Sequence, residues 1–268
     1  MKKQRKYSKN FIVGTVITGL MFVLLIWGLF GTPYDPDAMD ATLKFAPISW
    51  KHPMGCDNFG RDIFSRVLVG LGSTLLVAAG TVLIGTIVGT VIGAVTGYFG
   101  GVVDQVLMRV IDTMFAFPSI LLAMVIVSVM GRGTYQLILA LGIGFVPSYA
   151  RIVRGEFLKA KNADYVKAAR LYGASHFRII FVHILPNIKQ VLLSSVMIGF
   201  NNAVLAEAGM SYLGIGVQPP TATLGKMLSE AQTYLFSTPT YVLFPGIILV
   251  LLVLGFSLLG EGMKRGKK

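Results

Sequence analysis

Long apolar runs separated by short polar stretches dominate this sequence. A bilayer core of about 30 Å requires roughly 20 residues of helix. Six runs come close to that length, at about 11–31, 73–97, 115–131, 135–150, 189–210 and 241–260. The pattern therefore predicts an all-α membrane protein with about six transmembrane helices.

The first apolar run follows a basic cluster, as in a secretory signal peptide. The cluster comprises Lys2, Lys3, Arg5, Lys6 and Lys9. The run is longer than a signal-peptide core of roughly 7–15 residues, and no small-residue cleavage site follows it. We therefore expect it to remain in the protein as the first transmembrane helix.

The positions of lysine and arginine predict the orientation. With a cytoplasmic N-terminus and alternating segments, 18 of the 24 basic residues fall on the cytoplasmic side, where such an excess is expected. We predict a multi-pass protein of the cell (inner or cytoplasmic) membrane with both termini in the cytoplasm. The same scheme places the basic stretch 151–189 inside the cell.

Two connecting segments on the predicted outer side are longer than turns. Residues 32–72 contain four prolines and then apolar positions at helical spacing, so an amphipathic surface helix should lead into the second transmembrane helix. Residues 211–240 predict an irregular loop with a short helix at about 224–235. We divide the chain into an N-terminal helix with its outer segment, 1–72, and a transmembrane domain, 73–268.

Composition and motifs exclude several functions. Only 13% of residues are charged, against about 25% in a soluble domain. The net charge of +12 does not indicate nucleic-acid binding, because the basic residues lie at the ends of apolar runs. No phosphate-binding loop or hydrolase motif occurs, so we predict no catalytic residue and no cofactor in this chain. His52 falls outside and His176 and His183 inside, so we predict no metal site.

One predicted helix carries a stripe of small residues. Gly85, Gly89, Gly93 and Gly97 recur every four residues and share one helical face. Such a stripe lets another helix backbone approach closely. We interpret it as a packing surface, with a direct role in a pore as the alternative.

The basic stretch has the pattern of two short helices joined by a glycine turn. Asp164 is a candidate N-cap, Gly173 is a candidate helix stop, and a second helix should end near Pro186. The first helix should present Val166 together with Ala169 and Arg170. Small residues on that face indicate a surface for docking a partner, whereas a solvated linker is the alternative.

These residues resemble the cytoplasmic signature of the inner-membrane permeases of binding-protein-dependent ABC importers, which is Glu-Ala-Ala, three residues, Gly, nine residues, then x-x-Leu-Pro. Lys167 stands where that signature often has Glu. The resemblance implies a MetI-like type I importer fold and a coupling loop that docks on an ATPase subunit. The residues expected in that loop are Asp164, Lys167, Ala168, Ala169, Gly173, Leu185 and Pro186.

Three further segments resemble the C-type permeases of the dipeptide, oligopeptide and nickel systems. They are HPMGCDNFGRDIFSR at 52–66, GYFGG at 97–101 and LGIGVQPP at 213–220. The usual pattern has Thr where Cys56 stands, which argues against a special role for this thiol. Gly209 before Met-Ser is slightly closer to the nickel-type members, so nickel or metal chelates and short peptides both remain candidate substrates.

The resemblance implies several partners: a second homologous permease, two ATPase subunits that bind ATP and Mg, and an extracellular solute-binding protein. The chain itself is then not an enzyme. A stand-alone secondary transporter or channel is the alternative, but it would require intramembrane ionisable residues to couple ions. Of the acidic and histidine residues, Glu207 alone falls within a predicted span.

A polar stripe on the fifth predicted helix is a candidate lining of the translocation path. Ser194 and Ser195 recur two helical turns later as Asn201 and Asn202. Hydrogen bonding between helices is the alternative. Glu207 completes the candidate set, because a carboxylate near the outer end of the helix would meet a cationic substrate; it could also pair with the partner permease or reach the outer interface.

Overall fold

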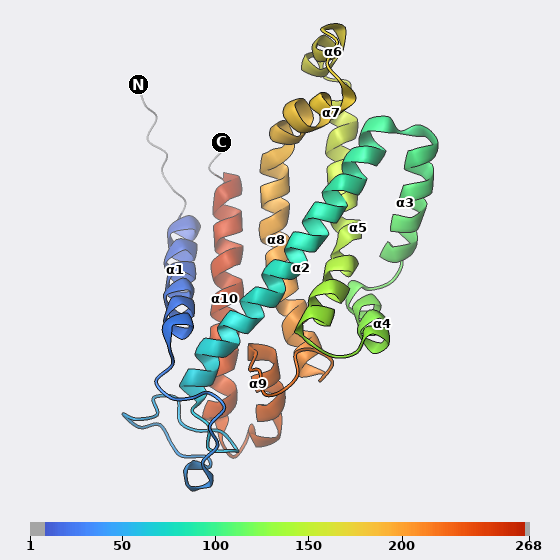
Figure 1. Ribbon diagram of the computed structural model, residues 1–268. Helices are drawn as coiled ribbons and strands as arrows, with labels where there is room; N and C mark the ends of the chain where they lie inside the picture. Colours follow the sequence, from blue (N-terminus) through green and yellow to red (C-terminus); the bar gives the residue numbers. More distant parts are fainter. Residues whose placement is uncertain (1–8, 266–268) are drawn as a thin grey trace, which may run out of the picture. The chain divides into compact units, whose positions relative to one another are not determined.

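The structure is a computed structural model that describes residues 9–265 (Figure 1). The basic residues predicted at 2, 3, 5 and 6, and the last two lysines, lie outside this range. The described part is helical without strands. Its long helices are α1 (Lys9–Phe30), α2 (Ile63–Phe99), α5 (Thr134–Ala160), α8 (Leu185–Tyr212) and α10 (Pro239–Arg265).

Shorter helices connect the long ones. They are α3 (Gly101–Phe115), α4 (Ser119–Met130), α6 (Asp164–Leu171), α7 (His176–Arg178) and α9 (Leu224–Ala231), with 3₁₀ turns at Ala41–Leu43 and Gln232–Tyr234. The helices α3 and α4 form a pair bent by 90°. Five described helices are long and apolar enough to cross a membrane, or six if the bent pair counts as one span. The all-α prediction with about six spans is confirmed.

Three predicted boundaries are wrong. The amphipathic outer helix is not separate, because α2 runs unbroken from Ile63 to Phe99. The fourth span does not end near 150, since α5 continues to Ala160. The helix from Ser175 does not end at Pro186, because a π-helical turn at Ile179–Ile184 leads directly into α8.

The chain divides into two compact units. Unit 1 comprises residues up to 79, 127–137 and from 200 onward, and unit 2 comprises 80–126 and 138–199. The helix α2 contributes to both, so the predicted boundary at 72–73 lies inside a helix.

In unit 1 a network of buried charges holds the segment between α1 and α2. The Asp57 carboxylate accepts hydrogen bonds from the backbone of Phe59 and from the Arg61 guanidinium, the latter at 2.6 Å. Arg61 also reaches Glu230 of α9 at 3.0 Å, and Arg66 pairs with Asp37 at 3.0 Å. Paired in this way, charges that would be costly to bury instead fix the fold of the connecting segment.

In unit 2 the glycine stripe of α2 packs against α5. A Cβ atom placed on Gly93 would lie 2.5 Å from the Ala150 carbonyl oxygen, and one on Gly97 would lie 2.6 Å from the Phe157 Cβ. No side chain fits such gaps, so the two backbones are in direct contact. The packing interpretation of the stripe is confirmed.

The contact predicts the effect of adding one methyl group. Gly93→Ala should lower the free energy of unfolding by about 1–3 kcal/mol, because the Ala150 backbone cannot move away freely. Gly155→Ala on α5 is the matched control, since nothing lies within 4 Å of its Cβ position. Thermal unfolding in detergent should show a lower Tm for Gly93→Ala only; equal Tm values would contradict the contact.

Candidate functional site: the loop between α5 and α8

The loop between α5 and α8 consists of α6, a tight turn, α7 and the π-helical turn, and in Figure 1 α6 lies beyond the end of α5. Gly173, at φ +77°, donates its backbone N–H to the Arg170 carbonyl at 3.0 Å. The Ala174 N–H bonds the Ala169 carbonyl at 3.0 Å. This pair of bonds is the Schellman motif, which satisfies the last carbonyls of a helix. Gly173 therefore ends α6 as predicted.

The start of α6 differs from the prediction. Ala163, in an extended conformation, is the N-cap residue and makes no side-chain cap bond. Asp164 is the first helical residue, where its charge favours the positive end of the helix dipole. Its carboxylate receives Lys167 Nζ at 3.3 Å, but both side chains are exposed, so the pair adds little stability.

The inner face of α6 is anchored in an apolar cluster of unit 2. Val166 is fully buried with Phe157 of α5, and Ile180 and Ile184 of the π-helical turn belong to the same cluster. Ala169 is partly buried against this cluster. The prediction that Val166 is presented to a partner is therefore wrong: this face holds the loop to its own unit.

Aromatic and basic side chains add a second anchor. The Tyr98 hydroxyl at the end of α2 lies 2.8 Å from His176 Nδ1, and the Arg170 guanidinium lies over the Tyr98 ring at 5.4 Å. Ser175 caps α7 by accepting the Arg178 N–H at 3.3 Å. Both helices of the loop are thus fixed against the end of α2.

The outer face of the loop exposes large apolar side chains. Leu171 is 88% exposed, Tyr172 is 92% exposed and Phe177 is 70% exposed. Lys167 and Ala168 are exposed beside them. Contiguous exposed apolar groups on a rigid support mark interaction sites. Leu171 and Tyr172 are absent from the predicted loop residues, although two large apolar residues directly before a glycine stop were the available signal.

Leu185 and Pro186 form the first turn of α8 rather than a helix end. The Leu185 N–H reaches back to the Ile180 carbonyl, in the i to i−5 pattern of the π-helical turn. This wider turn leads into Pro186, which has no N–H to donate. Leu185 packs partly against the cluster that holds α6.

The four polar residues of the predicted stripe, Ser194, Ser195, Asn201 and Asn202, all lie on α8, but their surroundings differ from one another. Ser195 bonds the Val191 carbonyl of its own helix at 2.9 Å, and Ser194 is partly buried. With its amide oriented to satisfy both neighbours, Asn201 donates to the Val253 carbonyl and accepts from the Ser257 N–H of α10. Asn202 is exposed. Asn201 thus bridges two helices, and a lining role for the set stays a prediction.

Glu207 is completely buried inside unit 1. Its Oε1 accepts the Ser211 hydroxyl at 2.7 Å, and Thr74 of α2 and Thr223 before α9 face the same carboxyl group. The side chain therefore does not reach an outer interface within this chain. Thr74 and Thr223 therefore lie near a carboxyl group carried by α8.

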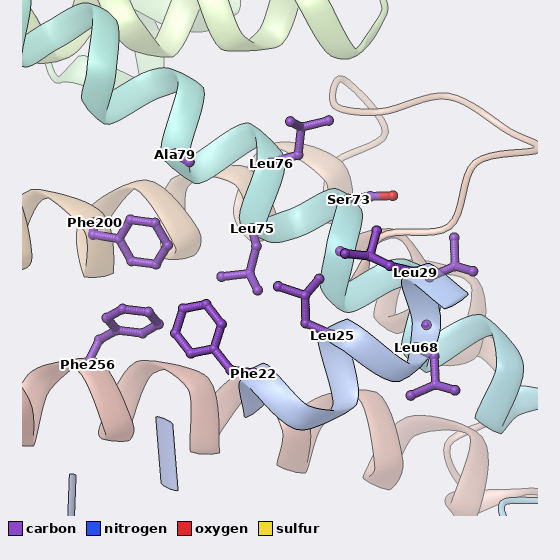
Figure 2. A pocket seen from close by; sticks show the side chains of 13 residues that line it. Phe22, Leu25, Leu29, Leu68, Ser73, Leu75, Leu76, Ala79, Phe200 and Phe256 are labelled. Carbon is purple, nitrogen blue, oxygen red and sulfur yellow. The ribbon is translucent and has the colours of Figure 1, made fainter. Parts of the chain in front are cut away.

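A pocket of about 630 Å³ lies in unit 1, between α1, α2, α8 and α10 (Figure 2). Its lining is almost entirely apolar, with Phe22, Phe200 and Phe256 on one side and Leu68 on another. Ser73 supplies a polar side chain there. No charged side chain is among the residues that line this pocket.

Comparison with known protein families identifies the family of this chain. The model of the binding-protein-dependent transport system inner membrane component matches residues 89–266. The chain therefore belongs to this family, the permease components of binding-protein-dependent ABC importers.

Two individual relatives indicate which members of the family this chain is similar to. The chain is 34% identical to the dipeptide transport system permease protein DppC of Haemophilus influenzae, over 97% of this chain and 90% of that one. It is 41% identical to the glutathione transport system permease protein GsiD of Salmonella typhimurium, over 94% and 84%. These are permeases of the same C-type subfamily that the sequence resembles.

A solved structure has the same fold. A chain of the inward-facing MetNI methionine ABC transporter matches with a TM-score of 0.62 at 20% identity, covering 76% of this chain and 97% of that one. The predicted MetI-like fold is confirmed.

Gly173 allows a test of the turn. Gly173→Val should strain the left-handed backbone by at least about 1–2 kcal/mol and loosen the loop, whereas Gly173→Asn tolerates this conformation. Trypsin should cut the Val variant within 161–170 several-fold faster than the wild type and the Asn variant. Identical rates for all three would show that the turn does not hold the loop.

Substitutions at Glu207 distinguish a structural role of this buried side chain from a role in the translocation path. Glu207→Gln keeps an acceptor for Ser211 and should retain stability and uptake, whereas Glu207→Ala should lose about 1–3 kcal/mol. The measurements are Tm in detergent and uptake by the assembled importer. Slower uptake by the Gln variant at unchanged Tm would instead support the predicted place in the translocation path.

Proposed function

We propose that this permease forms half of a translocation path for short peptides and that its loop between α5 and α8 transmits force from an ATPase subunit. The observation that carries the coupling proposal is the loop itself. Its inner face is locked into the apolar cluster of unit 2, while Leu171 and Tyr172 stand exposed on its outer face. A surface that is both rigidly held and apolar suits a contact that must transmit movement.

Orientation and partners follow from the same proposal. The loop must lie where ATP is available, so both termini are cytoplasmic, as the excess of basic residues predicts. A second permease of the same fold completes the path, two ATPase subunits bind ATP and Mg, and an extracellular solute-binding protein delivers the substrate. We prefer this arrangement to a stand-alone transporter because the family is binding-protein-dependent.

The substrate proposal depends on the relatives. The two permeases compared above have names that refer to dipeptide and glutathione transport, which favours short peptides for this chain. Nickel or a metal chelate remains a prediction, because the names of the two relatives compared above refer to peptides and not to metals. Uptake of labelled dipeptide, glutathione and nickel by the importer with its own binding protein tests this choice. Uptake of nickel alone would overturn it.

Charged substitutions at Leu171 and Tyr172 should abolish coupling to the ATPase without changing the stability of the protein. The double variant Leu171→Glu, Tyr172→Glu should reduce uptake at least tenfold and abolish co-purification with the ATPase subunits. Its Tm should be unchanged, because both side chains are exposed. Phe236→Glu, at a residue 98% exposed between α9 and α10, is the matched control and should leave both properties intact. Normal ATPase association of the double variant would contradict the docking proposal.

A further inference from the structure

A histidine, a cysteine and an aspartate meet in the segment between α1 and α2. Their ligand atoms, one each from His52, Cys56 and Asp62, all lie within 4.8 Å of one another. His52 Nδ1 is 2.8 Å from Asp62 Oδ1. Cys56 and Asp62 are buried, and the His52 side chain is 11% exposed. The sequence-based expectations of no metal site and of no special role for Cys56 rested on the separation of the three histidines and on the Thr of the usual pattern, and neither took this cluster into account.

The local backbone explains why the three residues meet. Gly55, at φ +76°, closes a turn in which its N–H bonds the His52 carbonyl at 2.9 Å, and this returns the chain toward Cys56. A second turn, capped by Asp57, pairs Cys56 with Asp62 across an isolated bridge. The cluster is therefore preformed by short-range contacts within 52–62.

The charges of the cluster are incompletely balanced. Asp57 has Arg61 as a partner, and Asp37 has Arg66. Asp62 is 3% exposed, yet among the described residues no lysine or arginine forms an ion pair with it. Its Oδ2 accepts the Ser65 N–H at 2.7 Å, and its Oδ1 faces only the His52 ring. A buried carboxylate of this kind is stabilised by a nearby cation.

We propose that His52, Cys56 and Asp62 bind one divalent transition-metal ion of the zinc type. Thiolate, imidazole and carboxylate together are a zinc ligand set. Tetrahedral ligand atoms lie roughly 3–4 Å apart, given metal–ligand bonds of about 2.0–2.3 Å. The three ligand atoms lie within 4.8 Å of one another, and His52 Nδ1 and Asp62 Oδ1 are 2.8 Å apart, so ion binding requires this pair to separate. Water takes the fourth position.

Binding of the ion releases one proton from the protein. The thiol gives its proton to solvent and becomes the sulfur ligand, while imidazole Nδ1 binds as the neutral base and keeps its proton on Nε2. No oxidant or reductant is needed. The ion replaces the hydrogen bond between His52 and Asp62, and its charge offsets the thiolate and the carboxylate together. The ion would thus act as a structural clamp on the connecting segment, independent of the transported substrate.

The test uses the full chain in detergent, purified with a tag that contains no histidine. The protein is first stripped of metal with a chelator, and Zn²⁺ is then added. After desalting, one Zn²⁺ ion should remain bound per chain, and the bound ion should raise Tm. Co²⁺ is the spectroscopic probe and should give a thiolate charge-transfer band. Cys56→Ser should remove the band and weaken Zn²⁺ binding at least tenfold.

Two further variants separate ligation from folding. Asp62→Asn can still cap α2, so it should retain the fold while weakening Zn²⁺ binding. His183→Asn, a histidine outside the cluster, should bind Zn²⁺ as the wild type does. The proposal fails if the wild type retains no Zn²⁺, if Cys56→Ser binds equally well, or if His183→Asn loses the ion.

Discussion

The direct backbone contact between α2 and α5 is the constraint on which unit 2 depends. Four glycines at four-residue spacing remove every side chain from one face of α2, so α5 can lie against it with Ala150 and Phe157 in contact. Lipid tails are as apolar as the helices themselves, so close packing rather than the hydrophobic effect holds such a pair. Any side chain larger than hydrogen at this face would push the two helices apart.

This contact positions the loop at the far ends of both helices. Phe157, which packs on Gly97, also belongs to the cluster that buries Val166 of α6. Tyr98, the next residue on α2, holds His176 through its hydroxyl group. Salt bridges from Arg154 to Asp104 and from Arg151 to Asp112 fasten α3 to α5. The loop is therefore an extension of a rigid helix pair, and force applied to its exposed face would pass into the spans.

The sequence predicted the features that depend on local pattern. Apolar runs gave the spans, glycine spacing gave the packing face, and Gly173 gave the turn. The surroundings of individual side chains could not be predicted as well from the sequence. Whether Val166 faced outward depended on the unpredicted extension of α5 to Ala160. Pro186 suggested a helix end because a π-helical turn leaves no pattern of its own. Glu207 lies near Thr74 and Thr223, which are distant from it in sequence, and the meeting of His52 with Cys56 required two consecutive turns.

The central claim is that the glycine contact holds the loop in place. Hydrogen exchange of the Gly173 and Ala174 amides tests it most directly, because both donate the bonds that end α6. Replacing Gly93 by leucine, about one and a half helical turns away from the loop anchor Tyr98, should force α2 and α5 apart and accelerate exchange at both amides, whereas Gly155→Leu should not. Unchanged protection of both amides in a folded Gly93→Leu protein would contradict the account.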